Sequence, residues 1–172
     1  MPSVVRPARP ADAESVAGIH VRSWQAAYVG IVPQPILDRL SVERRAASWR
    51  STIEDDGAER VWVVEEGDRI RGFASIGPAR DEDLPSGAGE LYAIYLEPES
   101  WSLGLGRRLF EAATRDLVAR GFEPLALWVL TDNIRGRRFY EAAGWLSDGE
   151  ARVLDFDGTP IEEVRYRPSK AP

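Results

Sequence analysis

The sequence predicts a mixed α/β fold in which helices flank a central, mostly antiparallel β-sheet. Three observations support this fold class. Apolar residues recur at helical spacing before residue 55, whereas β-rich runs and turn residues dominate residues 60–77 and 151–166. Between these regions, two apolar strands flank one amphipathic helix, which is typical of a parallel strand–helix–strand unit.

The N-terminal part of the chain is expected to form one short strand and three helices, at residues 4–6, 12–28, 35–40 and 42–53. Asp12 is of a residue type that caps helices, and Trp24 and Tyr28 are spaced as on one helical face. Gly30 and Pro33 are expected to end the first helix, because neither residue continues a helix well.

Strands and helices alternate in the remaining chain. The expected elements are strands at 60–65, 69–77 and 90–96, a helix at 105–120, a strand at 125–130, a helix at 135–143, and strands at 151–156 and 161–166. Turn residues between the first two and the last two of these strands predict antiparallel hairpins. The strands at 90–96 and 125–130 are expected to pair in parallel through a right-handed crossover.

Length and composition limit the possible functions. The 172 residues fit one domain, 1–172, and the net charge of −6 with a pI near 5.0 weighs against a nucleic-acid partner. There is no cysteine and His20 is the only histidine, so no cysteine nucleophile and no metal cofactor are expected. No secretory signal and no apolar run of membrane length is visible, which predicts a cytoplasmic protein without a membrane partner.

A glycine turn follows the strand at 90–96. It comprises Leu103, Gly104, Leu105, Gly106, Arg107 and Arg108. Glycines let a backbone approach an anion closely, and free N–H groups at a helix start carry partial positive charge. A dinucleotide fingerprint would have a third glycine where Leu109 stands, and the Gly-Lys-Ser/Thr of a P-loop is absent. The turn therefore predicts a phosphate ligand outside the usual NAD and ATP cradles; the alternative is a helix-entry turn whose glycines only relieve strain.

A second motif follows the glycine turn. Asn133 is followed by a small residue, Gly136, then by Phe139 and Tyr140, and a glycine and an aromatic residue close the motif. The chain thus contains, in order, a strand, the glycine turn, a second strand and this motif. In this order of elements it resembles the GNAT superfamily of acyl-CoA N-acyltransferases, and in particular its small single-domain bacterial members. The resemblance covers the whole chain and implies the GNAT fold, with acetyl-CoA as co-substrate.

The resemblance also implies roles by position. One strand would pair with the pantetheine arm of CoA through Ile94, Tyr95 and Leu96. The glycine turn would bind the pyrophosphate through backbone N–H groups, and Asn133 would bond the pantetheine region or serve only as a helix N-cap. Family members commonly carry Gln or Arg where Trp101 stands, so that side-chain contact to an anion is missing here.

Catalysis is expected to use Tyr140 and Glu90. Tyr140 would protonate the departing thiolate, and Glu90 would be the base, either directly or through water. Because the chain has no cysteine, direct transfer in a ternary complex is expected. The simpler alternatives are a packed core tyrosine and an ordinary carboxylate at a strand end. Arg135 and its basic neighbours either form a solvated face or reach the 3′-phosphate of CoA.

Trp24, Tyr28 and Tyr92 are expected to wall the pocket of the acceptor, while His20 is expected to be structural. The expected acceptor is a primary amine of a small molecule. The acidic run at 81–83 either attracts a cationic amine or is solvated. Two further functions stay open: acetylation of a protein N-terminus or lysine, and a non-catalytic acyl-CoA-binding sensor. A homodimer is also left open, since it depends on the exposure of apolar residues in the last hairpin.

Overall fold

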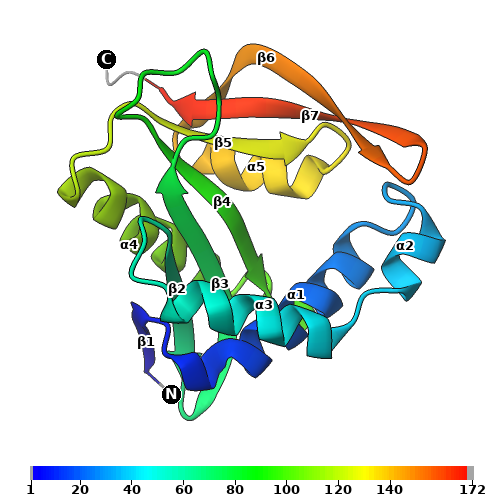
Figure 1. The fold of residues 1–172 in the computed structure, drawn as a ribbon, viewed down its shortest axis with the longest axis vertical. Coiled ribbons are helices and arrows are strands. Elements are labelled where there is room, and N and C mark those ends of the chain that lie inside the picture. The colour runs from blue at the N-terminus through cyan, green and yellow to red at the C-terminus, as the bar shows by residue number, and fades with distance from the viewer. Residues whose placement is uncertain (1, 170–172) are drawn as a thin grey trace.

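The computed structural model describes residues 2–169, which form one seven-stranded sheet (Figure 1). The strands lie in the order β1-β2-β3-β4-β5-β7-β6 and are antiparallel except for the pair β4 and β5. Their bounds are β1 (Ser3–Pro7), β2 (Arg60–Glu66), β3 (Arg69–Pro78), β4 (Gly89–Leu96), β5 (Leu125–Leu130), β6 (Trp145–Phe156) and β7 (Thr159–Pro168). The predicted fold class is therefore confirmed. The ends of the predicted domain, residues 1 and 170–172, lie outside the described residues.

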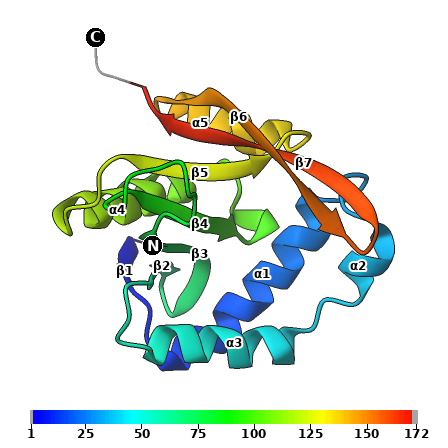
Figure 2. The same ribbon diagram turned by 45° about the horizontal axis from the view of Figure 1, so that its top comes forward.

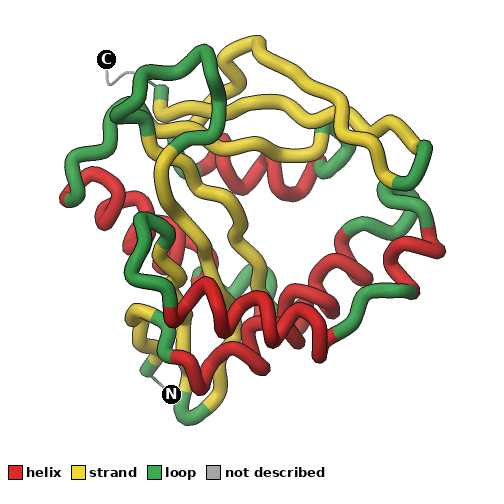
Figure 3. Tube along the Cα trace, viewed as in Figure 1, coloured by secondary structure: helices red, strands yellow, loops and turns green. Residues whose placement is uncertain are grey.

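Helices cover both faces of this sheet (Figures 2 and 3). Their bounds are α1 (Ala13–Ala27), α2 (Gln34–Asp38), α3 (Val42–Glu54), α4 (Leu105–Ala119) and α5 (Ile134–Ala142). Helices α1 and α3 cover one face of β2–β4, where Ile19 packs with Phe73. Helix α4 covers the opposite face, where Leu109 packs in a cluster with Leu127. The sheet is thus buried on both faces in its centre, as in a layered α/β domain.

The start of α1 differs from the prediction. Asp12 does not cap this helix with its side chain. Its carboxylate instead accepts hydrogen bonds from the guanidinium of Arg6 at 2.7 Å and from the N–H of Arg9 at 2.7 Å. A charged donor on β1 competes successfully for the carboxylate, because charge-assisted hydrogen bonds are stronger than neutral ones.

The last hairpin is longer than predicted. Strand β6 begins at Trp145, and its register with β7 is irregular between Ser147 and Ala151. This stretch contains the polar residues Ser147, Asp148 and Glu150 together with Gly149, which has a φ of +91°. They interrupt the alternation of apolar and polar residues by which strands are recognised, so the first half of β6 was not predicted.

The parallel pair at the centre of the sheet separates along its length. Strand β4 pairs with β5 only through Gly89–Leu91 and Leu125–Leu127. Beyond these residues β5 instead continues along β7, while β4 follows β3 in a different direction (Figure 1). Tyr92 stands at the irregularity in the register of β3 with β4, where an extra residue bends the strand. Within residues 2–169, the far half of β4 therefore has an edge with no neighbouring strand.

A third apolar cluster closes the side of the molecule opposite α4. Tyr28 on α1 and Leu37 on α2 pack with Leu130 on β5 and Ile161 on β7. An ion pair between Arg39 and Asp157 joins the end of α2 to the turn between β6 and β7. The N-terminal helices and the last hairpin thus meet at this end of the gap between β4 and β5 (Figure 2).

Two further features of the described residues bear on the expectations. None of the described helices has the length and apolarity needed to span a membrane. Leu146 and Val153 on β6 are both more than half exposed. These are apolar residues of the kind on which a homodimer would depend, and the homodimer stays a prediction.

Candidate active site

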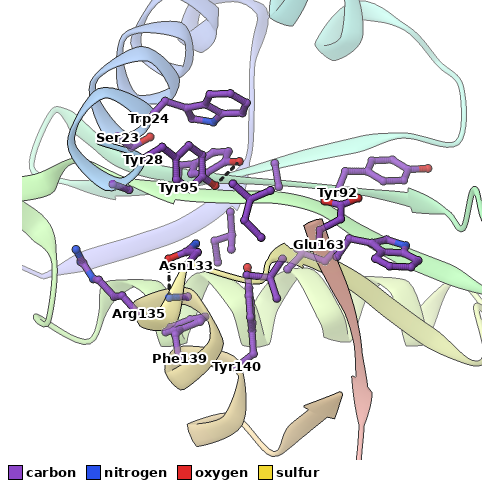
Figure 4. A pocket seen from close by; sticks show the side chains of 18 of the residues that line it. Ser23, Trp24, Tyr28, Tyr92, Tyr95, Asn133, Arg135, Phe139, Tyr140 and Glu163 are labelled. Atoms are coloured by element: carbon purple, nitrogen blue, oxygen red, sulfur yellow. Dashed lines mark hydrogen bonds between the residues drawn. The ribbon is translucent and has the colours of Figure 1, made fainter. Parts of the chain in front are cut away.

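A cavity of about 340 Å³ opens where β4 and β5 separate. Its walls come from α1, β4, β5, α5 and the last hairpin, and many of the predicted site residues line it (Figure 4). The predicted residues in this wall are Trp24, Tyr28, Glu90, Tyr92, Ile94, Tyr95, Leu96, Asn133 and Tyr140. The fold therefore brings together side chains that the sequence placed in three separate motifs.

The free edge of β4 exposes backbone groups to this cavity. The N–H of Glu97 donates to the carbonyl of Arg71 on β3 at 2.8 Å. Backbone groups of successive strand residues point to alternate edges, so those of Leu96 and Ile94 point toward the gap. The carbonyl of Leu96 accepts a hydrogen bond from Nε1 of Trp101 at 3.2 Å. This carbonyl can accept a second hydrogen bond, and the backbone N–H and carbonyl of Ile94 also face the gap. Both residues can therefore bond to an extended ligand.

Tyr95 has a different orientation from its two neighbours. It pairs with Phe73 on β3, and its ring stacks on His20 with centroids 5.5 Å apart. Its hydroxyl lies 3.4 Å from that of Tyr28. The side chain of Tyr95 thus belongs to the α1 wall of the cavity, and its predicted role in holding the cofactor stays a prediction.

The glycine turn forms the start of α4. Gly104 has a φ of +80° and directly precedes the helix, a conformation that favours glycine. At Gly106, a Cβ atom would stand 3.2 Å from Leu96 and 3.3 Å from Phe139, so the glycine lets α4 approach both β4 and α5. The first N–H groups of α4 lack partners within the helix and form a potential anion site.

The arginine side chains of the turn have intramolecular partners. Arg107 donates to Glu111 at 2.6 Å and to the carbonyl of Ala142 at 3.1 Å. Arg108 donates to the carbonyl of Ser3 at 2.9 Å. These intramolecular partners use only some of the donors of each guanidinium group, so the predicted backbone contacts to phosphate do not depend on them.

Arg135 brings a guanidinium to the same end of the cavity. It stands 3.2 Å from the centroid of the Trp101 ring, and both side chains line the cavity. No ion pair engages Arg135 within the described part of the chain. The sequence left two alternatives for Arg135: part of a solvated face, or a contact with CoA. Its position in the wall of the cavity favours contact with a ligand. The side chain of Trp101 carries no charge itself, but its ring holds the guanidinium of Arg135, which comes from α5, at this position.

Asn133 is a helix N-cap, and it also lines the cavity. Its Oδ1 accepts a hydrogen bond from the N–H of Gly136 at 3.0 Å, which leaves Nδ2 as a donor. A Cβ atom at Gly136 would stand 2.6 Å from Nδ2, so the glycine leaves room for this amide. The cap fixes the side chain of Asn133 and leaves its Nδ2 free to donate a hydrogen bond to a ligand.

Tyr140 lies on α5, half-buried against Phe110, Phe139 and Tyr166. Its hydroxyl enters the cavity (Figure 4), and no hydrogen-bond partner for it is found among the described residues. Burial raises the pKa of Tyr140, so the hydroxyl holds its proton at neutral pH. The ring of Tyr140 is thus packed against its neighbours, while its hydroxyl is exposed to the cavity.

Glu90 is a buried carboxylate at the start of β4. It is 5% exposed, and one of its oxygens accepts a hydrogen bond from the N–H of Arg80 at 3.0 Å. Burial raises the pKa of Glu90. The guanidinium of Arg80 stands 3.8 Å from the centroid of the Tyr92 ring, and the hydroxyl of Tyr92 donates to the carbonyl of Pro78. Glu90 therefore combines access to the cavity with a greater tendency to accept a proton than an exposed glutamate has.

His20 has the structural surroundings that were expected. Its Nδ1 accepts a hydrogen bond from Nε1 of Trp49 at 3.1 Å, and its ring packs among four aromatic rings. Burial lowers the pKa of His20 to about 4, so the ring is neutral at physiological pH. It supports the wall formed by Trp24 and Tyr95 and does not line the cavity itself.

Comparison with known proteins agrees with this geometry. The model of the acetyltransferase (GNAT) family matches residues 22–145, which is more than half of the chain. The N-acetyltransferase YuaI of Bacillus subtilis (strain 168), itself uncharacterised, is 35% identical over 130 residues, covering 75% of this chain and 72% of YuaI. The chain belongs to the GNAT family. It is an N-acetyltransferase.

Two further acetyltransferases are similar to this chain, one in sequence and one in structure. A mycothiol acetyltransferase of Saccharopolyspora erythraea is 31% identical over 153 residues, covering 80% of this chain but 48% of that protein. The crystal structure of PaiA N-acetyltransferase from Thermoplasma acidophilum, in complex with coenzyme A, has a TM-score of 0.74 and 20% identity. That alignment covers 95% of this chain and 98% of PaiA.

The acidic run at 81–83 is partly engaged in ion pairs. The side chain of Asp81 is only 7% exposed, accepts from Nε1 of Trp128 at 3.0 Å, and contacts the guanidinium groups of Arg152 and Arg165. Asp83 also pairs with Arg165, at 2.8 Å. These carboxylates join the loop before β4 to the last hairpin, while Glu82 and Asp83 stay exposed to solvent. Attraction of a cationic amine by this run stays a prediction.

Several residues of this GNAT site could not be identified from the sequence alone. They lie on β5 and on the last hairpin and are Trp128, Arg152, Phe156 and Glu163. The sequence of β7 gave no clear signal, because Glu163 shares its face of the strand with both the apolar Ile161 and the charged Arg165. The pairing of β7 with β5, across the parallel unit, was needed to place these residues beside Tyr140.

Proposed function

We propose that this N-acetyltransferase transfers the acetyl group of acetyl-CoA directly to a primary amine of a small molecule, in a ternary complex. One observation carries the proposal: a single cavity joins the free edge of β4, the hydroxyl of Tyr140 and the buried carboxylate of Glu90. Since the chain has no cysteine, a covalent acetyl-cysteine intermediate is not available. The nucleophile must therefore be the acceptor itself.

The residues present fit acetyl-CoA. The edge of β4 at Ile94 and Leu96 suits the amide groups of the pantetheine arm, with Nδ2 of Asn133 as a further donor. The start of α4, over residues 104–108, suits the pyrophosphate through backbone N–H groups. When bound, acetyl-CoA supplies an activated acetyl thioester, whose acyl group passes to the amine nitrogen with release of the CoA thiol.

Two side chains would handle the protons of the reaction. Glu90 accepts a proton from the acceptor amine, directly or through water, because only the neutral amine has a free electron pair for attack. Tyr140 holds a proton at neutral pH and can donate it to the sulfur that departs. Backbone N–H groups on the free edge of β4 can polarise the carbonyl that is attacked.

The closed end of the cavity favours a small acceptor over a polypeptide. The contact of α2 with the last hairpin, including the pair Arg39–Asp157, closes this end. An extended peptide would need an open groove here. The non-catalytic sensor is distinguished by experiment, because a sensor would bind acetyl-CoA without releasing thiol in the presence of any amine.

Arg135→Gln tests the phosphate end of the cofactor site. The variant is expected to raise KM for acetyl-CoA about 10- to 100-fold, since a hydrogen bond to a charged group contributes about 1.5–3 kcal/mol. KM for acetyl-pantetheine, which lacks the diphosphate and adenosine, should not change. Arg138→Gln, on the same helix, is the matched control. Equal effects on both thioesters would contradict a phosphate contact by Arg135.

Tyr140→Phe tests the proton donor. Turnover should fall about 10- to 1000-fold, the range of lost acid–base assistance, with little change in the affinity for acetyl-CoA. Steady-state thiol release and calorimetric titration with CoA measure the two quantities. Unchanged turnover would remove Tyr140 from the mechanism.

Glu90→Gln tests the base through the pH dependence of turnover. A base must be ionised, so the activity of the native enzyme should rise as the pH increases through the pKa of Glu90, which burial raises. The Gln variant should lose this rise and retain low activity. An identical pH–rate profile for both proteins would show that another group accepts the proton.

A further inference from the structure

Glu163 is a buried carboxylate that the proposed chemistry does not use. The register of β7 with β5 pairs it with Leu130, the last residue of β5, where β4 and β5 are already separated. It is 6% exposed and lines the cavity, which it enters from β7 while Tyr140 enters from α5 (Figure 4). Glu163 therefore faces the part of the cavity in which an acceptor would lie.

Only part of the hydrogen-bonding capacity of Glu163 is used. Its Oε1 accepts a hydrogen bond from Nε of Arg152, and no partner for Oε2 is found within residues 2–169. Arg152 is also shared, because it contacts Asp81 at 3.3 Å and stacks over Trp128 at 4.1 Å. An ionised carboxylate can accept about four hydrogen bonds, so Glu163 keeps free acceptor positions at the cavity that it lines. A donor from a ligand would complete this shell.

The charge around Glu163 favours a cation. In the ion-pair network of this end of the sheet, four carboxylates face two guanidinium groups. The carboxylates belong to Asp81, Asp83, Asp148 and Glu163, and the guanidinium groups to Arg152 and Arg165. The excess of negative charge attracts a positive ligand and repels a negative one.

The remaining wall of this part of the cavity is aromatic. Trp24 and Tyr28 come from α1, and Phe156 comes from β6. Nε1 of Trp24 is buried and has no hydrogen-bond partner in the described chain. Aromatic faces accept apolar groups and also attract cations. The surroundings thus combine one negative charge with an apolar enclosure.

We propose that Glu163 binds the ammonium form of the acceptor, and that the acceptor class is a primary amine with an apolar or aromatic body and no carboxylate beside the nitrogen. A carboxylate at that position would be brought against Glu163 and repelled. Arg80 and Arg152, which could otherwise attract it, already stack on aromatic rings next to carboxylates. This inference rests on the proposed acetyltransferase function and adds a binding contact, with no further covalent step.

Two acceptors with the same aromatic body test the class. 2-Phenylethylamine and L-phenylalanine differ only in the carboxylate beside the nitrogen, and thiol release from acetyl-CoA is measured with each. The expected kcat/KM is at least about 10-fold higher for 2-phenylethylamine. L-Phenylalanine should bind less well, because its carboxylate is repelled by Glu163 and disturbs the charge-assisted contact of its ammonium group. Equal rates, a preference for L-phenylalanine, or acetylation only of amines outside this class would overturn the inference.

Glu163→Gln tests the residue. KM for 2-phenylethylamine should rise about 10- to 100-fold, while KM for acetyl-CoA stays unchanged, because only the acceptor loses a charge-assisted partner. Glu162→Gln is the matched control, since Glu162 is exposed on the opposite face of β7. An unchanged KM for the amine, or equal changes for both substrates, would overturn the role of Glu163.

A second variant keeps the test valid if Glu163→Gln does not fold, as judged by thermal unfolding. Glu163→Asp retains the charge but withdraws the carboxylate by one methylene, and the same selective rise in KM for the amine is expected. Failure of the inference also differs from failure of the proposed function. If no amine of any class supports thiol release although CoA binds, the proposed function itself is wrong.

Discussion

The separation of β4 from β5 is the constraint on which the rest of the site depends. A parallel strand pair normally continues its ladder of hydrogen bonds, but here pairing ends at Leu91 and Leu127. The extra residue at Tyr92 bends β4 along β3, while β5 follows β7. Backbone groups at Ile94 and Leu96 then face a gap, and unpaired groups of this kind bind an extended ligand well.

The same separation divides the gap into two chemically different ends. At one end lie the start of α4, Asn133 and the stacked pair of Arg135 and Trp101, where a negative ligand is favoured. At the other end lie the buried carboxylates of Glu90 and Glu163, where a cation is favoured. This polarity suits a reaction between an anionic thioester donor and a cationic amine, which would meet near Tyr140.

The sequence predicted the framework well, because the framework depends on local patterns. The helical spacing before residue 55, the hairpin turns and the strand–helix–strand unit all correspond to elements that the structure contains. The Asn133 motif identified one wall of the cavity, and the glycine turn identified the start of α4, since each motif is contiguous in the chain. Local propensity did not predict the first half of β6, where an irregular register carries polar residues.

Features that depend on long-range pairing could not be predicted in this way. Arg135 meets Trp101 only because α5 packs beside the start of α4, and Glu163 reaches the cavity only because β7 pairs with β5. The partners of Asp81 and Arg108 were likewise not predicted, because each partner lies on a distant element. Side-chain roles at a site thus follow from the topology of the sheet, whereas the presence of the site follows from motifs.

Hydrogen–deuterium exchange with and without CoA tests the central claim most directly. If the gap beside β4 holds CoA, exchange should slow in peptides that cover residues 92–96 and 104–108, because their amide groups gain ligand partners. Peptides from β1 and β2, on the far edge of the sheet, should not change. Tight binding of CoA without protection of residues 92–96 would contradict the assignment of the free edge of β4 as the cofactor site.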